Sequence, residues 1–130
     1  MKVSLNWQAV EQLAPPSLGE HLFEVMESMI EGTKARITLR VDEEGAESGR
    51  RLVHGFTLIA TEEQPLAYMA MALSLKNFGL VDAGVDDPEL DVKRMASIVG
   101  RRYRASVIRS KTEEGRLFPN IDPSTVVEVS

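Results

Sequence analysis

The chain has 130 residues, of which 43% are apolar and 27% are charged, and this composition is typical of one globular domain rather than a disordered segment. It contains no cysteine, which excludes disulfides, thiolate metal sites and cysteine nucleophiles. A formal net charge of −5 argues against a uniformly basic nucleic-acid binder.

The start of the chain predicts a soluble, cytoplasmic protein that does not associate with membranes. Residues 1–7 lack the apolar run and the small-residue cleavage site of a secretory signal, and no stretch approaches the length of a membrane span. We expect residues 1–17 to form a lead-in segment, because Pro15 and Pro16 must end any helix before them. Residues 18–129 are then expected to form the folded domain.

Three strands are predicted in the first half of the chain. Residues 18–30 favour an extended form with a bulge, whereas residues 34–41 alternate most clearly between apolar and polar side chains. Residues 50–60 resume the alternation after a polar loop. The side chains predicted to face inward are His21, Phe23, Val25, Ala35, Ile37, Leu39, Val41, Leu52, His54, Phe56 and Leu58.

Two helices are predicted next. Residues 61–64 have the spacing of a capping box and precede a proline, so a helix is expected over residues 65–78 with its end at Gly79. A second helix is expected to begin at Asp87 as its N-cap and to end at Gly100. The first helix is apolar on almost every side.

The last part of the chain returns to strand. Residues 101–111 alternate, with Tyr103, Ala105 and Val107 inward, and residues 116–129 predict a strand broken at Pro119 and Pro123 after a turn at 112–115. The predicted fold is therefore mostly β, a five-stranded barrel with the helices between strands 3 and 4, because closure removes exposed sheet edges. A small α+β sandwich remains the alternative.

No catalytic centre is recognisable, and we predict that the protein is not an enzyme. His21 and His54 are far apart in the sequence, and no pair of carboxylates at helical spacing accompanies them as metal ligands. His54 lies on an apolar strand face, where a core histidine is the simpler interpretation. Phosphate-loop and serine-elbow motifs are also absent from the sequence. We therefore predict no catalytic residue, no metal and no cofactor.

Basic side chains occupy alternate strand positions. The outward positions of residues 34–41 and 101–111 carry bases without acids, which favours a surface that contacts phosphates. The alternative is a solvated strand face neutralised by neighbouring acids. Candidate stacking side chains are few and are equally plausible in the core: Tyr68, Phe78, Tyr103 and Phe118. The predicted nucleic-acid-binding residues are Lys34, Arg36, Arg40, Arg51, Arg102 and Arg104.

Several stretches along nearly the whole chain carry a family resemblance: Leu5 to Trp7 with Val10 and Glu11, Ser17 to His21, Gly49 to Leu52 with Phe56 to Leu58, Ala72 to Leu80, and Ile98 to Arg104. In their order and spacing the chain resembles a family of small bacteriophage proteins, long catalogued as a domain of unknown function. That family includes OB-fold single-stranded-DNA-binding proteins found among phage replication and recombination genes.

The resemblance implies an OB-like barrel that binds single-stranded DNA without sequence preference in the host cytoplasm. A homodimer, or a phage or host replication or recombination protein, is the further partner that it implies. The net charge and the scarcity of aromatic residues favour an alternative of another class, a protein–protein adaptor on the same barrel.

Overall fold

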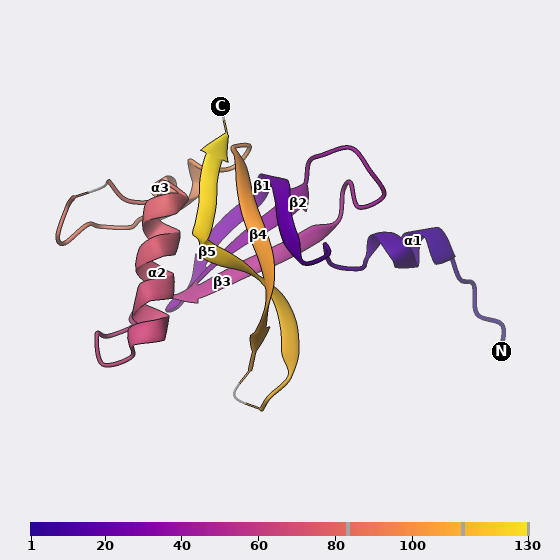
Figure 1. Ribbon diagram of the computed structural model, residues 1–130, viewed down its shortest axis with the longest axis horizontal. Helices are drawn as coiled ribbons and strands as arrows, with labels where there is room; N and C mark the ends of the chain where they lie inside the picture. Colours follow the sequence, from indigo (N-terminus) through magenta and orange to yellow (C-terminus); the bar gives the residue numbers. More distant parts are fainter. Residues whose placement is uncertain (83, 113, 130) are drawn as a thin grey trace.

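The centre of the protein is one five-stranded antiparallel sheet with the order β3-β2-β1-β4-β5 (Figure 1). The computed structural model describes residues 1–82, 84–112 and 114–129. Its elements are α1 (Trp7–Gln12), β1 (Gly19–Glu31), β2 (Lys34–Val41), β3 (Arg51–Thr57), α2 (Pro65–Asn77), α3 (Val92–Ala96), β4 (Arg102–Lys111) and β5 (Leu117–Val129). The predicted mostly-β fold with helices between the third and fourth strands is confirmed.

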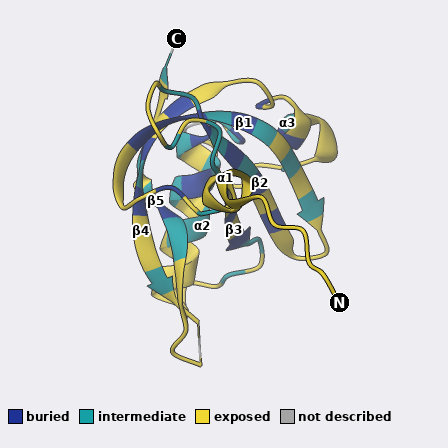
Figure 2. Cartoon of the chain, turned by 90° about the vertical axis from the view of Figure 1, so that its right-hand side faces the viewer, coloured by how far each residue is buried: buried dark blue, intermediate teal, exposed yellow. Residues whose placement is uncertain are grey.

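The strand faces agree with the alternation in the sequence. In β2 the odd-numbered residues from Ala35 to Val41 are buried, while Lys34 and Arg36 are exposed. The predicted bulge in β1 is present, because its pairing with β2 shifts register between Val25 and Glu27. Figure 2 shows the buried residues gathered on the inner side of the curved strands. The inward side chains of the strands thus supply most of one core.

The predicted closure into a barrel is wrong, because no backbone ladder joins β3 to β5 in the described part of the chain. Instead α2 contacts both strands, and side chains bridge the opening. The ring of His54 on β3 lies 2.8 Å from Asn120 Oδ1 on β5 and 2.9 Å from Ser74 Oγ on α2. Two prolines in β5 have no N–H to donate, and a strand edge tolerates them. Side-chain hydrogen bonds therefore stand where a ladder was expected.

Strand β5 is not broken at its prolines. It runs continuously from Leu117 to Val129, and a register shift against β4 between Arg104 and Ser106 leaves residues 123–126 outside the ladder. The extra residues of a bulge accommodate Pro123 without ending the strand. The predicted breaks of the strand at Pro119 and Pro123 are therefore wrong.

The two helices between β3 and β4 differ in how well the sequence predicts them. Helix α2 ends as expected, with Gly79 at φ +73°, although the Gln64 side chain makes no capping hydrogen bond. Helix α3 is shorter than predicted at both ends: its N-cap is Asp91 instead of Asp87, with the Asp91 side chain accepting from the Arg94 N–H, and its last residue is Ala96, four residues before Gly100. No described helix is long and apolar enough to cross a membrane.

Helix α1 stands apart from the rest of the protein (Figure 1). The side chain of Asn6 caps it by accepting a hydrogen bond from the Ala9 N–H, at 3.2 Å. No residue of α1 is buried. The predicted lead-in segment thus consists of an exposed short helix followed by a stretch that joins the sheet, where Pro16 is buried.

Candidate nucleic-acid interface

The strand between the two basic strands carries acids. β1 lies between β2 and β4, and its Glu24 is opposite Arg40 on one side and Arg102 on the other. Glu24 Oε1 accepts from Arg40 Nη2 at 3.1 Å, and Arg102 Nε donates to Asp42 Oδ2 at 2.9 Å. The outward positions of β2 and β4 themselves carry no acid. In the folded protein, however, acids from β1 and from the loop after β2 lie beside their arginines.

A third predicted residue is also paired, since Arg36 Nη1 lies 3.3 Å from Glu31 Oε2. We call Arg36, Arg40 and Arg102, with the carboxylates that hold them, the paired patch. Arg40 has two carboxylate neighbours, since its Nη2 atom lies 3.1 Å from Glu24 Oε1 and 3.8 Å from Asp42 Oδ1. An incoming phosphate would have to displace carboxylates before it could bind here, which weakens the gain from each contact.

The other three predicted residues have no carboxylate partner in the described structure. Lys34 Nζ donates to Thr57 Oγ1 at 2.7 Å, which still leaves donors available. Arg51 and Arg104 are exposed on β3 and β4, and no described acid lies within ion-pair distance of either. These residues are open to a ligand, but they lie on different strands of the sheet.

A second group of cations lies on the β4–β5 hairpin, which projects beyond the sheet (Figure 1). β1 pairs with β4 only as far as Val107, so residues 108–111 and 117–120 pair with each other alone. We call Arg109, Lys111 and Arg116 the hairpin cations. All three are exposed, and within residues 1–82, 84–112 and 114–129 none pairs with an acid.

Sequence reasoning missed the hairpin cations for an identifiable reason. Arg109 and Lys111 have the same parity as Tyr103, Ala105 and Val107, which alternation assigns to the inner face. Beyond the end of β1 that face is no longer covered by the core, so both side chains meet solvent. The sequence did contain a signal. Charged residues at two successive inward positions, Arg109 and Lys111, indicate that this end of the strand extends beyond the core.

A groove of about 390 Å³ lies beside the hairpin. Its walls combine three prolines, Leu18, Leu117 and Phe118 with two arginines, Arg50 and Arg109, and no acid is among its described lining residues. Phe118 is 38% exposed, so its ring is accessible. Among the other stacking candidates, Phe78 and Tyr103 belong to the core. An exposed aromatic residue and two arginines thus line the same groove.

Hydrogen bonds of His21 hold one edge of this groove in place. His21 Nδ1 lies 2.7 Å from Glu43 Oε1, and Nε2 lies 2.8 Å from the carbonyl oxygen of Ser17, which lines the groove. Both ring nitrogens face acceptors, so both must donate. Burial opposes the charge, but the hydrogen bonds to Glu43 and Ser17 outweigh it and raise the pKa of His21.

A neighbouring carboxylate holds the same segment. The Ser17 hydroxyl donates to Glu47 Oε2 at 2.6 Å, and the hydrogen bonds from Ser17 lower the pKa of Glu47. Glu47 Oε1 lies 3.5 Å from Arg50 Nη1. The acidic loop between β2 and β3 therefore anchors the lead-in segment where it enters β1.

The second histidine lies at the base of the hairpin and is neutral. Asn120 Oδ1 accepts from the Ile121 N–H, so it must also accept from His54 Nδ1, and the Ser74 hydroxyl donates to Nε2. Burial lowers the pKa of His54. A serine, a histidine and an asparagine in this order suggest a nucleophile with its base. However, Ser74 is 0% and His54 is 1% exposed, so a substrate could not reach them.

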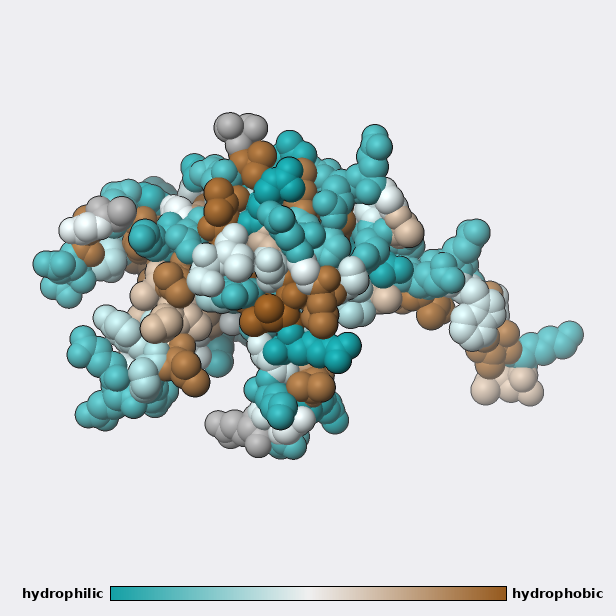
Figure 3. Space-filling view, in the orientation of Figure 1, coloured by the Kyte–Doolittle hydropathy of each residue, from teal (hydrophilic) through white to brown (hydrophobic). Residues whose placement is uncertain are grey.

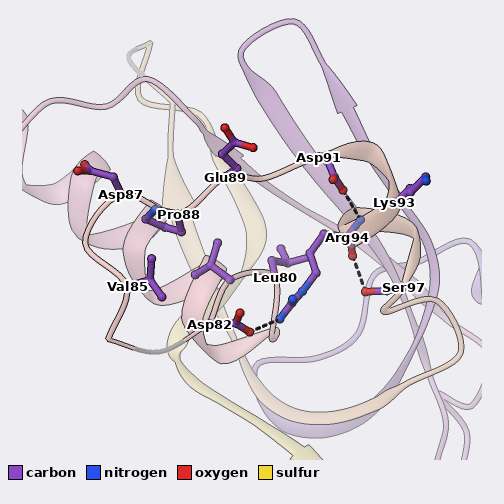
Figure 4. A pocket seen from close by; sticks show the side chains of 11 residues that line it. Leu80, Asp82, Val85, Asp87, Pro88, Glu89, Asp91, Lys93, Arg94 and Ser97 are labelled. Atoms are coloured by element: carbon purple, nitrogen blue, oxygen red, sulfur yellow. Dashed lines mark hydrogen bonds and ion pairs between the residues drawn. The ribbon is translucent and has the colours of Figure 1, made fainter.

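A separate cavity of about 470 Å³ has the opposite charge (Figure 4). Asp82, Asp87, Glu89 and Asp91 line it, and Arg94 is held by Asp82 at 3.0 Å. Despite these acids, no group of three or more metal-ligating side chains occurs in the described residues. Phosphates would be repelled here, which leaves the hairpin and its groove as the candidate interface.

No protein-family model matches the chain, and no curated protein sequence matches it. The function is therefore inferred from the geometry and the charge of these surfaces.

Proposed function

We propose that the protein binds single-stranded DNA without sequence preference, and that the strand lies along the β4–β5 hairpin and the groove beside it. The observation that carries the proposal is the set of hairpin cations, which have no described carboxylate partner and of which Arg109 lines the same groove as the accessible Phe118. Cations neutralise phosphates and release counterions, while an aromatic ring stacks on any base.

We further propose that the sheet is an OB-like barrel that is left open between β3 and β5. The strand order and the helices between β3 and β4 support this interpretation. OB-folds are partly open five-stranded barrels, and the loop between strands 4 and 5 is one of their ligand-binding loops. A role in phage replication or recombination rests on the family resemblance of the sequence.

The six residues predicted from sequence take unequal parts in this proposal. Arg51 and Arg104 extend the path of the DNA across the sheet, because no described acid neutralises them. Lys34 contributes a phosphate contact at the end of β2. The paired patch contributes less per residue, because its carboxylates compete with phosphate.

The test is a titration of a labelled oligothymidine and a matched duplex at several salt concentrations. The single strand should bind more tightly, because only unpaired bases can stack on Phe118. The hairpin cations alone should give a slope of log affinity against log salt of about −2, and a steeper slope if Arg51 and Arg104 take part. Equal binding of duplex, or binding that is independent of salt, would overturn the proposal.

A protein–protein adaptor is the second candidate. Leu66 on α2 is 84% exposed and Met69 is also largely exposed, and such apolar surface is typical of a contact with another protein. A folded protein that fails to bind any oligonucleotide at low salt would favour this function.

A further inference from the structure

A second groove, of about 750 Å³, lies between α2 and the segment that follows it. Leu58, Met71 and Leu75 line it and also pack against the core. Tyr68, which is 38% exposed, lines it as well. Asp82, Asp86 and Asp87 add negative charge, which Lys76 offsets in part. The groove is therefore an apolar trough with an acidic border.

The helix beside the groove lacks the polar outer face of an ordinary surface helix. Nine of the ten residues from Leu66 to Leu75 are apolar, yet only Ser74 within α2 is fully buried. Apolar side chains are visible on the surface of this part of the molecule in Figure 3. A helix that is apolar on every side is normally covered, so this face indicates a missing contact.

The other uncovered element is the N-terminal arm, by which we mean residues 1–13. Every residue of the arm is exposed, including Trp7 at 69%. Trp7, Val10 and Leu13 recur at the spacing of one helical face. Helices shorter than about 12 residues are marginally stable alone in water, so a surface that covered its apolar face would stabilise the six-residue helix α1.

The arm stands away from the groove of its own molecule. Ser17 is bound to Glu47 and His21, so the arm is tethered from that point. The chain between Gln12 and Ser17 spans at most about 17 Å when fully extended. Figure 1 shows α1 and α2 at opposite ends of the long axis, with the sheet between them. The short tether and this placement favour docking between molecules over docking within one.

We propose that the arm of one copy docks into the groove beside α2 of a second copy. The apolar face of Trp7, Val10 and Leu13 matches the apolar trough in character. Charge does not oppose the contact, because the side chains of the arm carry one base and one acid, Lys2 and Glu11, while Lys76 and three aspartates line the groove. Arm and groove are different surfaces, so the contact is head-to-tail and extends into rings or filaments. It requires no DNA, so it stands or falls independently of the proposed function.

Trp7 makes the contact measurable, because it is the only tryptophan in the chain. With rising protein concentration and no DNA present, its fluorescence should shift to shorter wavelength while sedimentation velocity shows dimers and larger species. Val10→Glu in the arm and Tyr68→Glu in the groove should each weaken self-association at least tenfold. Val53→Glu is the matched control, since Val53 is an exposed apolar residue on β3, outside both surfaces.

A mixing experiment then tests the direction of the contact. Val10→Glu retains its groove and Tyr68→Glu retains its arm, so an equimolar mixture should form dimers that cannot grow further. Melting curves like that of the unaltered protein verify that each variant is folded. The proposal is overturned if the unaltered protein stays monomeric at all concentrations. In that case the Trp7 fluorescence would either remain that of a solvent-exposed indole, or lie at shorter wavelength at every concentration because the arm docks in the groove of its own molecule. It is also overturned if the mixture stays monomeric or if Val53→Glu has the same effect.

Discussion

The acidic loop between β2 and β3 and the β4–β5 hairpin differ in whether nearby cations are paired with acids. The loop supplies Asp42, Glu43 and Glu47, which hold Arg102, His21 and Arg50. The hairpin has Glu114 in its turn, but none of its cations forms an ion pair in the described part of the chain. The difference teaches that neither the net charge nor the local density of arginine identifies a binding surface. The acids that fold beside each cation decide whether it is available.

The two histidines show the same contrast. His21 belongs to the acidic loop and faces two acceptors, so its surroundings favour the charged ring. His54 fixes the base of the hairpin through Asn120, and burial favours its neutral ring. Both were predicted as inward residues of a strand, and both are buried. Their protonation is set by partners far away in sequence.

The largest effect should come from the hairpin cations. Changing Arg109, Lys111 and Arg116 together to alanine should weaken binding to single-stranded DNA at least tenfold at low salt. The slope of log affinity against log salt should become shallower by about 2, because about 0.7 is lost per phosphate contact on a single strand. Fluorescence anisotropy at several salt concentrations measures both quantities.

The matched control removes the same charge from the paired patch. Arg36, Arg40 and Arg102 changed together to alanine should alter affinity and slope much less, because described carboxylates already neutralise these side chains. Melting curves must verify that both triple variants fold. If the patch variant loses as much binding as the hairpin variant, the two regions are equivalent and the comparison is wrong.

Replacing Phe118 should have the next largest effect. Stacking on an aromatic side chain contributes roughly 1 to 3 kcal/mol per base, so Phe118→Ala should lower affinity within that range. Phe118→Tyr should bind nearly as well as the unaltered protein, since it keeps a ring. The salt slope should be the same for all three proteins, because no phosphate contact changes. If Phe118→Ala binds single-stranded DNA as tightly as the unaltered protein does, bases do not stack on Phe118.

The two histidines should affect stability with opposite pH dependence. The lowered pKa of His54 means that the unfolded chain takes up a proton near pH 6.5 while the native protein does not. Stability from this site is therefore present above about pH 6.5 and falls as the pH drops. The raised pKa of His21 reverses the sign. Its contribution is complete below about pH 6.5 and is lost as the pH rises through the raised pKa.

Urea unfolding from pH 5.5 to pH 8.5 measures this contrast. The stability lost in His21→Gln should be larger at the acidic end of the range, and the stability lost in His54→Gln should be larger at the alkaline end. Parallel curves for the two variants would show that the histidines do not differ in protonation as their partners indicate.

The smallest effect should come from releasing part of the paired patch. Asp42→Asn frees Arg102 and removes a weaker partner of Arg40 at 3.8 Å, so affinity for single-stranded DNA should rise. Exposed ion pairs are worth about 0.2 to 1 kcal/mol, which limits the gain to roughly fivefold. Asp86→Asn makes the same change in net charge away from the patch. An equal gain in both variants would assign the effect to net charge alone.

The sequence by itself determined the faces of the strands and the end of α2. Alternation in residues 34–41 predicts which β2 side chains are buried, because each residue of a strand faces one side regardless of distant partners. Gly79 marks the end of α2 for an equally local reason, since the chain there takes a positive φ that favours glycine. Both depend on neighbours within a few residues.

The tertiary structure alone decided which cations are available and whether the sheet closes. Glu24 neutralises part of the predicted surface because β1 lies between β2 and β4, which the alternation within each strand does not encode. Arg109 and Lys111 are exposed at inward positions because β4 extends past the end of β1. The β3–β5 edge stays open where His54, Asn120 and Ser74 bond through side chains. Each of these outcomes depends on contacts between residues far apart in the chain, whereas the patterns in the sequence report local burial.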